Sequence, residues 1–483
     1  MTRRNDISRP DPFVSTDRLV WLIVLTTGVT LALWTGSKWY FGDRFADVFK
    51  YPAKAASLTA TTLMCWAVIL STRLRFLEDI SAGLDKMYAL HKNTGRWSFF
   101  IILLHPLFLS AHNLPDVPAF LRDLWFLQPL SDRYILGHNL GVTVLLLMAA
   151  LVALTLWVRV PYHLWKRSHE AFGLVLLLVI AHVYTVDRDV AAYPLLRAWM
   201  YGLFALAAAS YLYIRFLYRF LGLHYPYSVS RVERCGDILE ITFSPAGKKM
   251  DFRPGQFVYL VVSKPGISRE PHPFSIASGY HLNAEFKLGI RMIGDYTRTL
   301  DRLEEGDAVT FYGPYGHFGD RFLSADRDCV FIGGGIGITP FLGMWHVALH
   351  SEERLDERDV PEPIRHFHPE ILRSWKSPRV HLIYVCRDEA DASFDDDIRG
   401  EIAACRALGF GPLEERDHGY ELYLSESRDR ISAAYIHSQV KGGAIDRMIF
   451  LCGPPAMMES LTRQFRDLGV PGDRIVFENY SLK

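Results

Sequence analysis

Cysteine is scarce in this chain, and the few cysteines do not occur in close pairs. Only six are spread over 483 residues, and none forms a Cys-x-x-Cys spacing. Close spacings of that kind are typical of structural zinc sites and iron–sulfur clusters, and dense even-numbered cysteines are typical of disulfide frameworks. The sequence therefore weighs against all three. The cysteines are Cys65, Cys235, Cys329, Cys386, Cys405 and Cys452.

A net charge is also lacking, because 53 basic residues balance 53 acidic ones. This balance argues against a nucleic-acid-binding protein that relies on a large basic excess. The charges are nevertheless divided unevenly. Residues 1–222 hold 22 Lys and Arg against 14 Asp and Glu, a net charge of +8, and the remainder has a net charge of −8. A chain of this length is expected to contain two or three domains, and its two halves differ in composition.

The N-terminus lacks the features of a cleavable signal peptide. Charged residues from Arg3 to Arg18 precede the first apolar run, and no small-residue cleavage site follows that run. We therefore expect a retained first membrane span.

Long apolar stretches are abundant in the first half. Six have nearly the length needed to cross a bilayer, and an even number would place both ends of this region on one side. The loops expected on the side of the N-terminus carry 12 Lys and Arg, against 8 in the opposite loops, which predicts that both chain termini are cytoplasmic. The stretches are 19–39, 55–72, 96–114, 138–160, 169–186 and 195–221.

The second half has short segments typical of a soluble protein. Those near 238–243 and 256–262 are rich in β-branched and aromatic residues, which predicts an antiparallel barrel. From about Asp328 the pattern becomes strand, glycine-rich turn and helix, which predicts an α/β domain. The predicted organisation is multi-domain: a tail (1–17), a six-helix transmembrane bundle (18–222), a β-barrel (223–326) and a Rossmann-like α/β domain (327–483) with a surface insertion at 352–377.

Four histidines fall within or beside the apolar stretches. His91 and His105 are 14 residues apart, and His169 and His182 are 13 apart, so each interval spans roughly 20 Å of helix. Two such helices can hold two haem irons, each ligated by one histidine from each helix. The alternative is four interfacial or hydrogen-bonded core histidines. Since thirteen residues do not return to the same helix face, we expect a distortion at His169 or an oblique helix, and Pro106 predicts a further irregularity.

Two segments of the predicted barrel suit a flavin. His272, Pro273, Phe274 and Ser275 follow a β-rich stretch, where a hydroxyl can reach a flavin nitrogen and an aromatic ring can stack. The segment from Arg291 through Gly294 to Thr297 offers a cation, a glycine turn and a hydroxyl at an expected helix start, which suits a pyrophosphate. Each could also be an ordinary strand end or turn.

Two further segments suit a nicotinamide dinucleotide. Gly333, Gly335, Gly337 and Thr339 follow a predicted strand, although Pro340 replaces the last glycine of the usual dinucleotide fingerprint. Cys452 and Gly453 follow another buried strand, where a nicotinamide could lie.

With these motifs in this order, the chain after its tail resembles the ferric reductase and NADPH oxidase superfamily. In that family a two-haem, bis-histidine membrane domain is fused to a ferredoxin–NADP reductase-like module. The size resembles a compact bacterial member, which implies a multi-pass protein of the inner (plasma) membrane. The resemblance implies that His91 and His169 hold an inner haem b, and that His105 and His182 hold an outer one.

The resemblance also implies cofactor contacts in the soluble half. FAD would bind through His272, Phe274, Ser275, Arg291 and Thr297. NADPH, with NADH as the alternative, would bind through Gly335, Gly337, Thr339, Arg387, Cys452 and Gly453, and less directly Ser425 and Arg428. Ser275, Cys452 and Tyr480 would lie at the reaction centre, with Tyr480 or Phe477 covering the flavin. The motif His-Pro-Phe-Ser is closer to the oxidases than to the reductases, whose usual form is Arg-x-Tyr-Ser.

The expected function is electron transfer from cytoplasmic NADPH through FAD and two haems to an acceptor across the membrane. Dioxygen, giving superoxide, is the favoured acceptor, with Lys50 or Lys54 as a nearby cation. A ferric chelate is the alternative, and a partner protein or a transporter with a fused reductase are further ones. No obligate protein partner is indicated. A ferric chelate could use His112, His138, Asp116, Asp132, Asp187 and Asp189, although headgroup contacts are the favoured role for both histidines.

Overall fold

The computed structural model describes residues 13–42, 47–81, 83–158, 160–278, 285–350, 378–407 and 418–478. The chain forms two compact units, Met1–Leu221 and Gly222–Lys483, which are described separately below. The expected insertion at 352–377 and the aromatic residue Tyr480 lie outside the described residues.

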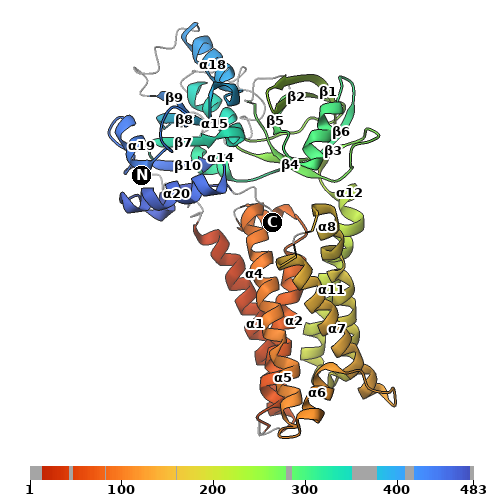
Figure 1. The fold of residues 1–483 in the computed structure, drawn as a ribbon. Coiled ribbons are helices and arrows are strands. Elements are labelled where there is room, and N and C mark those ends of the chain that lie inside the picture. Colours follow the sequence, from red (N-terminus) through yellow and green to blue (C-terminus); the bar gives the residue numbers. More distant parts are fainter. Residues whose placement is uncertain are drawn as a thin grey trace, which may run out of the picture. The chain divides into compact units, whose positions relative to one another are not determined.

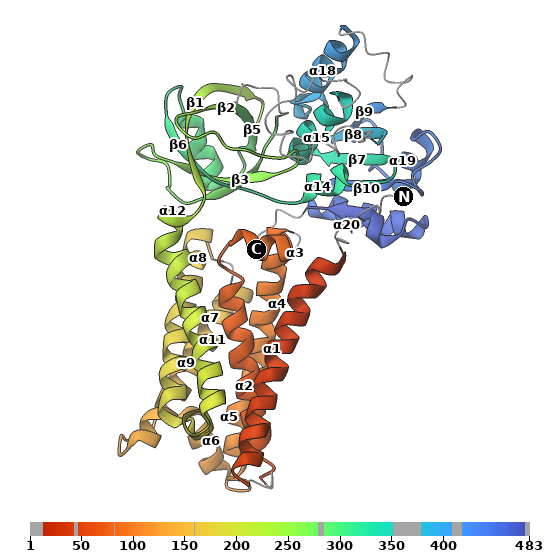
Figure 2. The same ribbon diagram turned by 180° about the vertical axis from the view of Figure 1, so that it is seen from behind.

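The first unit is helical throughout its described residues, and its long helices run side by side (Figures 1 and 2). Its elements are α1 (Phe13–Tyr40), α2 (Lys50–Ile69), α3 (Arg75–Ser81), α4 (Leu84–Ile102), α5 (Leu104–Ala111), α6 (Val117–Trp125), α7 (Arg133–Leu156), α8 (Tyr162–Glu170), α9 (Phe172–Val186), α10 (Arg188–Ala192), α11 (Pro194–Leu212), the π-helical turn η1 (Tyr213–Leu217) and α12 (Tyr218–Leu221).

Four helical segments of this unit are long and apolar enough to cross a membrane, so the chain is an integral membrane protein. The other two predicted stretches also form helices, α2 and α4–α5, but these are more polar. Lys50 and Lys54 lie at the start of α2, and α4 begins at Leu84, twelve residues before the predicted stretch. The four segments are Arg18–Tyr40, Arg133–Leu156, Leu164–Val186 and Pro194–Leu221.

Two of the long helical segments are interrupted between their histidines. The third predicted stretch is interrupted at Leu103, between α4 and α5. Pro106 accounts for this break, because it has no N–H to bond the carbonyl of Ile102 and its ring crowds that carbonyl. The fifth predicted stretch is interrupted at Ala171, so that His169 lies in the last turn of α8 and His182 lies on α9. The irregularity expected at His169 is confirmed.

The second unit begins with an antiparallel sheet of six strands in the order β4-β3-β6-β1-β2-β5. An isolated bridge between Ile276 and Leu288 links the segment after β4 to the opposite edge strand, so the sheet curls into a partly closed barrel. Buried aromatic rings, among them Phe243 and Phe311, fill its core. The strands are β1 (His224–Cys235), β2 (Ile238–Pro245), β3 (Phe257–Val262), β4 (His272–Ser275), β5 (Phe286–Arg291) and β6 (Ala308–Tyr315), and α13 (Asp295–Thr299) and η2 (Leu300–Arg302) follow β5.

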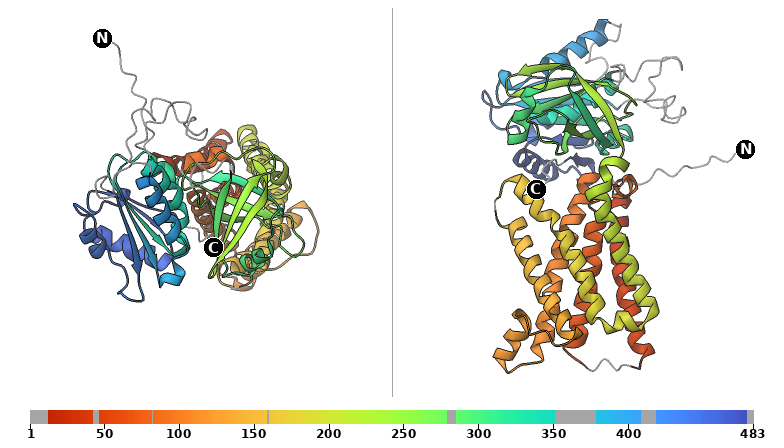
Figure 3. Two further views of the ribbon diagram at one scale, coloured as in Figure 1. Left: turned by 90° about the horizontal axis from the view of Figure 1, so that it is seen from above. Right: turned by 90° about the vertical axis from the view of Figure 1, so that its right-hand side faces the viewer.

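A parallel sheet of five strands follows, in the order β11-β10-β7-β8-β9. Helices cover both faces of this sheet (Figure 3). Apolar side chains of α15 and α18 pack on one face, and those of α19 and α20 pack on the other. The strand order reverses between β7 and β10, where ligands commonly bind in such folds. The elements are α14 (Phe318–Leu323), β7 (Cys329–Gly334), η3 (Gly335–Ile338), α15 (Thr339–His350), β8 (Val380–Cys386), η4 (Glu389–Asp391), α18 (Asp395–Ala407), β9 (Gly419–Leu424), α19 (Ala433–Gln439), β10 (Met448–Cys452), α20 (Pro455–Asp467), η5 (Gly472–Arg474) and β11 (Ile475–Phe477).

Candidate functional site

The four histidines of the helical unit meet in two pairs. The ring centroids of His91 and His169 are 5.8 Å apart, and those of His105 and His182 are 6.5 Å apart. We call these the inner pair and the outer pair. A metal–imidazole bond is about 2 Å long, which puts the ring centroids of two axial ligands roughly 6 Å apart. Both pairs therefore fit the two ligands of a haem iron.

Backbone carbonyls orient three of the four imidazoles. The Nδ1 atom of His91 lies 2.6 Å from the carbonyl oxygen of Ala67, and the Nδ1 of His105 lies 2.9 Å from that of Ala53. The Nδ1 of His182 lies 2.8 Å from the carbonyl oxygen of Gly137. Since a carbonyl can only accept, Nδ1 carries the proton and Nε2 keeps the lone pair that a metal needs.

Two glycines of α7 allow the close approach that His182 requires. A Cβ added at Gly141 would lie 2.8 Å from Cε1 of His182, and one added at Gly137 would lie 1.9 Å from Val186. The spacing of these glycines is the small-xxx-small pattern of closely packed membrane helices. Sequence reasoning overlooked this signal, which points to the contact between α7 and α9.

His169 is held differently from the other three. Its Nδ1 is buried without a hydrogen-bond partner in the described part of the chain. Instead, its ring stacks on Trp165, with centroids 5.2 Å apart and planes 12° from parallel. The inner pair therefore has one imidazole fixed by a hydrogen bond and one fixed by a ring contact.

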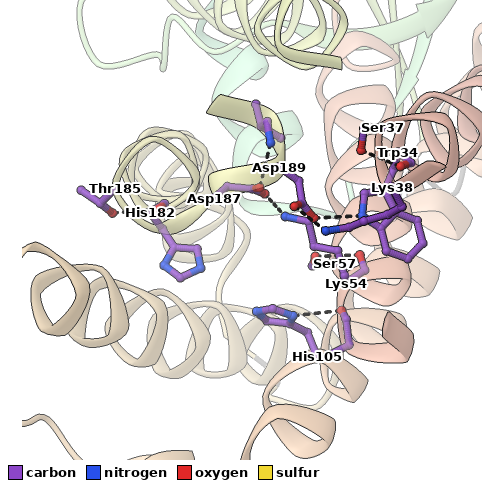
Figure 4. Close-up of polar contacts among 12 residues, drawn as sticks. Trp34, Ser37, Lys38, Lys54, Ser57, His105, His182, Thr185, Asp187 and Asp189 are labelled. Carbon is purple, nitrogen blue, oxygen red and sulfur yellow. Dashed lines mark hydrogen bonds and ion pairs between the residues drawn. The ribbon is translucent and has the colours of Figure 1, made fainter. Parts of the chain in front are cut away.

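Charged side chains lie beside the outer pair (Figure 4). Lys54 forms an ion pair with Asp187. Nζ of Lys38 lies 2.6 Å from Oδ1 of Asp189, whose other oxygen accepts from the indole of Trp34 at 3.0 Å. Sequence reasoning considered Lys54 as a cation for the acceptor and the two aspartates as a surface for a chelate. In the structure Lys54 pairs with Asp187, and Lys38 pairs with Asp189.

The other residues considered for the acceptor have local partners. Asp116 caps α6 by accepting from Ala119 N at 3.0 Å, and Asp132 caps α7 by accepting from Tyr134 N at 2.7 Å. His138 Nε2 lies 2.9 Å from the carbonyl oxygen of Asp123, and the exposed His112 bonds within its own helical turn.

The expected flavin segment forms β4 of the barrel. Ser275 is buried and lies opposite Phe257 of β3, Pro273 lies opposite Tyr259, and Phe274 is half-buried on the barrel core. The ring of His272 stacks on Tyr296, with centroids 3.5 Å apart. Thus β4 presents a hydroxyl, an aromatic ring and an imidazole along one strand.

The expected pyrophosphate segment connects the barrel to the glycine turn after β7. Arg291 ends β5, and its Nε donates to Asp237 at 2.6 Å. A Cβ added at Gly335 would lie 3.9 Å from Nη1 of Arg291, so this guanidinium reaches the turn. Gly294 precedes α13, and the hydroxyl of Thr297 bonds back to Gly294 N at 3.0 Å.

The two nucleotide turns pack backbone against backbone. A Cβ added at Gly337 would lie 2.5 Å from the carbonyl oxygen of Cys452, and one added at Gly453 would lie 3.0 Å from Cα of Gly334. Gly335 and Gly453 have φ of +54° and +156°, which L side chains rarely adopt. Glycine is therefore required for this contact. The segments predicted to bind the nucleotide meet at the reversal point of the sheet.

Cys452 and Glu478 are buried near this point. Burial raises the pKa of the Cys452 thiol well above its usual value, and the charge of Glu478 raises it further. A Cβ added at Gly316 would lie 3.1 Å from Oε1 of Glu478, so this carboxylate lies beside the turn that follows β6. Sequence reasoning missed Glu478, because it considered only the aromatic residues Phe477 and Tyr480. Phe477 is half exposed.

The residues expected at the nucleotide's ribose lie at the ends of β8 and β9. Exposed Arg387 pairs with Asp388 at 3.0 Å and with Asp391 at 3.4 Å. The hydroxyl of Ser425 donates to the carbonyl of Cys386 at 3.1 Å, which places Ser425 beside Arg387.

Arg428 is engaged elsewhere. It bonds Glu421 at 3.0 Å and the hydroxyl of Tyr435 at 2.8 Å, and its guanidinium lies over the ring of Tyr423. The structure brings Ser425 to Arg387, but it holds Arg428 in a separate set of contacts.

Comparison with protein families gives three matches along the chain. Residues 56–180 match the ferric reductase-like transmembrane component, residues 224–317 an FAD-binding domain and residues 331–463 an oxidoreductase NAD-binding domain. These matches follow the order of the helical bundle, the barrel and the parallel sheet.

Individual relatives are more distant. A probable cell surface ferric reductase of Aspergillus oryzae is 26% identical over 372 residues, which is 69% of this chain and 45% of that protein. A flavohemoprotein of Rhodopirellula baltica is 23% identical over 248 residues, 48% of this chain and 53% of that protein. The chain thus spans 45% and 53% of the length of these two relatives. Among solved structures, the FAD/NAD-binding domain of a Vibrio cholerae nitric oxide dioxygenase matches 53% of this chain and 97% of that one, with 20% identity and a TM-score of 0.40.

The three family matches cover one helical and two soluble components in a fixed order. The chain therefore belongs to the ferric reductase and NADPH oxidase superfamily, with a ferric reductase-like transmembrane component followed by FAD-binding and NAD-binding domains.

Proposed function

We propose that this protein is a transmembrane oxidoreductase that moves electrons from cytoplasmic NAD(P)H, through FAD and two haems b, to a small acceptor across the membrane. The observation that carries this proposal is the meeting of four histidines in two pairs, with centroid separations of 5.8 and 6.5 Å. The chemistry that FAD supplies when bound is hydride acceptance and single-electron release, and haem supplies single-electron carriers inside the membrane.

The chain's own residues bind and orient these groups. The carbonyls of Ala67, Ala53 and Gly137 direct three imidazoles so that Nε2 can ligate iron. The glycine turns after β7 and β10 let backbone amides approach a diphosphate. In the barrel, the hydroxyl of Ser275 would donate a hydrogen bond to a flavin nitrogen. Buried Cys452 would stay a neutral thiol beside the nicotinamide and would exclude water there.

The proposed topology has six spans with both chain termini in the cytoplasm. The four apolar segments would be joined by α2, which packs against α1, α4, α5 and α11, and by α4–α5, in which no charged residue follows Arg96. The domain boundaries we propose are 18–222 for the haem domain, 223–326 for the FAD domain and 327–483 for the NAD(P)H domain.

We propose NADPH as the preferred donor, with NADH also accepted. Arg387 follows β8 at the place where a cation can bind the 2′-phosphate of the nucleotide. Asp388 and Asp391 pair with this guanidinium, and such carboxylates suit a ribose hydroxyl better than a phosphate. The mixture of charges predicts a modest preference for NADPH.

Dioxygen is the acceptor that we propose, with superoxide as product. Lys38 and Lys54 beside the outer pair are each matched by an aspartate. A locally balanced charge favours a small neutral acceptor over an anionic chelate, which would need an uncompensated cation. The ferric-chelate alternative has its support in the likeness to the Aspergillus oryzae protein.

The purified full-length protein, reconstituted with FAD and haem, can test the function and the acceptor together. With NADPH in excess, cytochrome c reduction that superoxide dismutase abolishes would support the oxidase. Reduction of a ferric chelate, detected with ferrozine under nitrogen, would support the reductase instead. If NADPH reduces the haem bands but neither acceptor is reduced, a partner protein is the acceptor. If NADPH leaves the haem bands oxidised, the proposed electron path is wrong.

A further inference from the structure

Two ion pairs are largely buried at one end of the helical bundle (Figure 4). The side chains of Lys54 and Asp187 are 16% and 8% exposed, and those of Lys38 and Asp189 are 8% and 19% exposed. Exposed ion pairs contribute little to stability, whereas removing one partner of a buried pair leaves an uncompensated charge. Both pairs lie at helix ends, with Lys38 in the last turn of α1, Lys54 near the start of α2 and Asp187 at the C-terminal cap of α9.

The Lys54–Asp187 pair joins the two elements that hold the outer histidines. The carbonyl oxygen of Ala53 lies 2.9 Å from Nδ1 of His105, and Lys54 is the next residue of α2. Asp187 ends α9, the helix that carries His182, and its other oxygen accepts from Val190 N at 3.0 Å. The ion pair therefore connects the anchor of one imidazole to the helix that carries the other.

The second pair connects the same turn to α1. Asp189 lies two residues after Asp187, and it binds both Lys38 and the indole of Trp34. Three helical elements thus converge on one short acidic turn. The two lysines and two aspartates of these ion pairs cancel in formal charge, and Arg188, which lies between the two aspartates, is exposed to solvent.

We propose that the Lys54–Asp187 pair positions the outer pair of histidines and keeps the charge around it balanced. This inference rests on the proposed haem ligation, and it assigns these two side chains a positioning role rather than contact with the acceptor. At the inner pair, Glu170 follows His169 and pairs with Arg215 at 3.6 Å, but these two side chains are 33% and 48% exposed. The ion pair beside the outer pair is therefore the more buried of the two.

The test is a stepwise redox titration of the haem absorbance in the full-length, haem-loaded protein. Asp187→Asn leaves the Lys54 cation unpaired, so the outer component should shift to a more positive potential. Lys54→Met leaves the Asp187 anion unpaired, so the same component should shift to a more negative potential. The exchange Lys54→Asp with Asp187→Lys should return it toward the wild-type value. The inner component should stay unchanged in all three.

The matched control is Asp116→Asn, which removes a carboxylate that caps α6 outside this cluster. It should leave both components unchanged. The proposal is overturned if both single variants shift the outer component in the same direction, or if neither shifts it. A purely structural role would change haem content or both components together, without opposite signs.

If a single variant fails to bind haem, a double variant provides the test instead. Lys54→Met combined with Asp187→Asn leaves the local charge unchanged and should retain a near wild-type potential with an altered low-spin electron paramagnetic resonance signal, because the tie between α2 and α9 is gone. An unaltered signal contradicts the positioning role. If the wild-type protein binds fewer than two haems, the proposed function fails instead.

Discussion

The helical unit and the parallel-sheet domain use opposite parts of the chain for their proposed functions. In the helical unit the functional groups are side chains, four imidazoles, and the backbone serves to orient three of them. In the parallel-sheet domain the functional groups are backbone amides exposed by glycine, and nearby side chains adjust the site. The comparison teaches that removing an imidazole side chain should abolish function in the helical unit, whereas adding a methyl group to a turn glycine should do so in the parallel-sheet domain.

The largest expected effect is the loss of an outer histidine. His105→Ala or His182→Ala should halve the haem content and reduce acceptor reduction to background, because an iron left with one axial ligand is not retained. Pyridine haemochrome assays measure the content. His112→Ala, which removes an exposed histidine outside both pairs, should keep full content. Retention of two haems in either variant would show that the histidine side chain is not decisive for haem binding in the helical unit.

The corresponding change in the soluble unit is Gly337→Ala. Its methyl group would lie 2.5 Å from the carbonyl oxygen of Cys452, and relieving such a clash costs on the order of 3 kcal/mol. NAD(P)H-driven flavin reduction should fall about a hundredfold, with haem content unchanged. Gly400→Ala on α18, where nothing lies within 4 Å of the new atom, should leave the rate unaltered. Equal rates in the two variants would contradict the backbone role.

A subtler change separates the two histidine pairs. Trp165→Leu removes the ring on which His169 stacks. The inner haem should then show a shifted low-spin electron paramagnetic resonance signal, while the outer signal stays constant. Phe216→Leu, at an exposed position on η1, is the control. A shift confined to the outer signal would show that the pairs are assigned in the wrong order.

Side chains near the nucleotide should have smaller effects. Arg387→Ala should raise KM for NADPH about tenfold, as expected for one lost charged hydrogen bond, and should leave KM for NADH nearly unchanged. Arg428→Ala should leave the ratio of the two constants unaltered, since Glu421 and Tyr435 already hold that guanidinium. Steady-state kinetics with both nucleotides decide this. An unchanged NADPH constant for Arg387→Ala would remove its proposed role.

The smallest expected effect concerns Cys452, whose pKa is raised by burial. The raised pKa keeps the thiol protonated, so alkylation by iodoacetamide between pH 7 and 9 should be negligible in the folded protein. In urea the alkylation should be rapid, because a free thiol has a pKa of about 8.5. Peptide mass spectrometry identifies the modified residue. Rapid alkylation of Cys452 in the folded protein, at a rate that does not change between pH 7 and 9, would show a reactive thiolate at the turn.

Local sequence features predicted much of this structure. Apolar stretches predicted the long helices, and short segments rich in β-branched and aromatic residues predicted the strands of the barrel. The 13-residue interval between His169 and His182 predicted a distortion at His169 or an oblique helix, and the structure has a break at Ala171. Such features depend on neighbouring residues and on fixed helical geometry, which is why they can be read from a single chain.

Contacts between distant residues could not be predicted in this way. Lys54 and Asp187 are 133 residues apart, and Lys38 and Asp189 are 151 apart, so only the packing of the helices brings them together. The burial of Glu478 likewise depends on the completed sheet. Gly137 and Gly141 did carry a local signal, but it indicates close packing without naming the partner helix.

The wide separation of these ion-paired residues also bears on how the protein is made. Lys38 and Lys54 are synthesised more than a hundred residues before their aspartate partners, and α2 is not among the segments apolar enough to enter a membrane unaided. The helix α2 must therefore pack against neighbouring helices to enter the membrane, and its Lys54 lacks its partner until the turn after α9 is synthesised. Assembly of this end of the bundle is thus a late event in biogenesis, and a chain truncated before Asp187 would expose two unpaired cations to quality control.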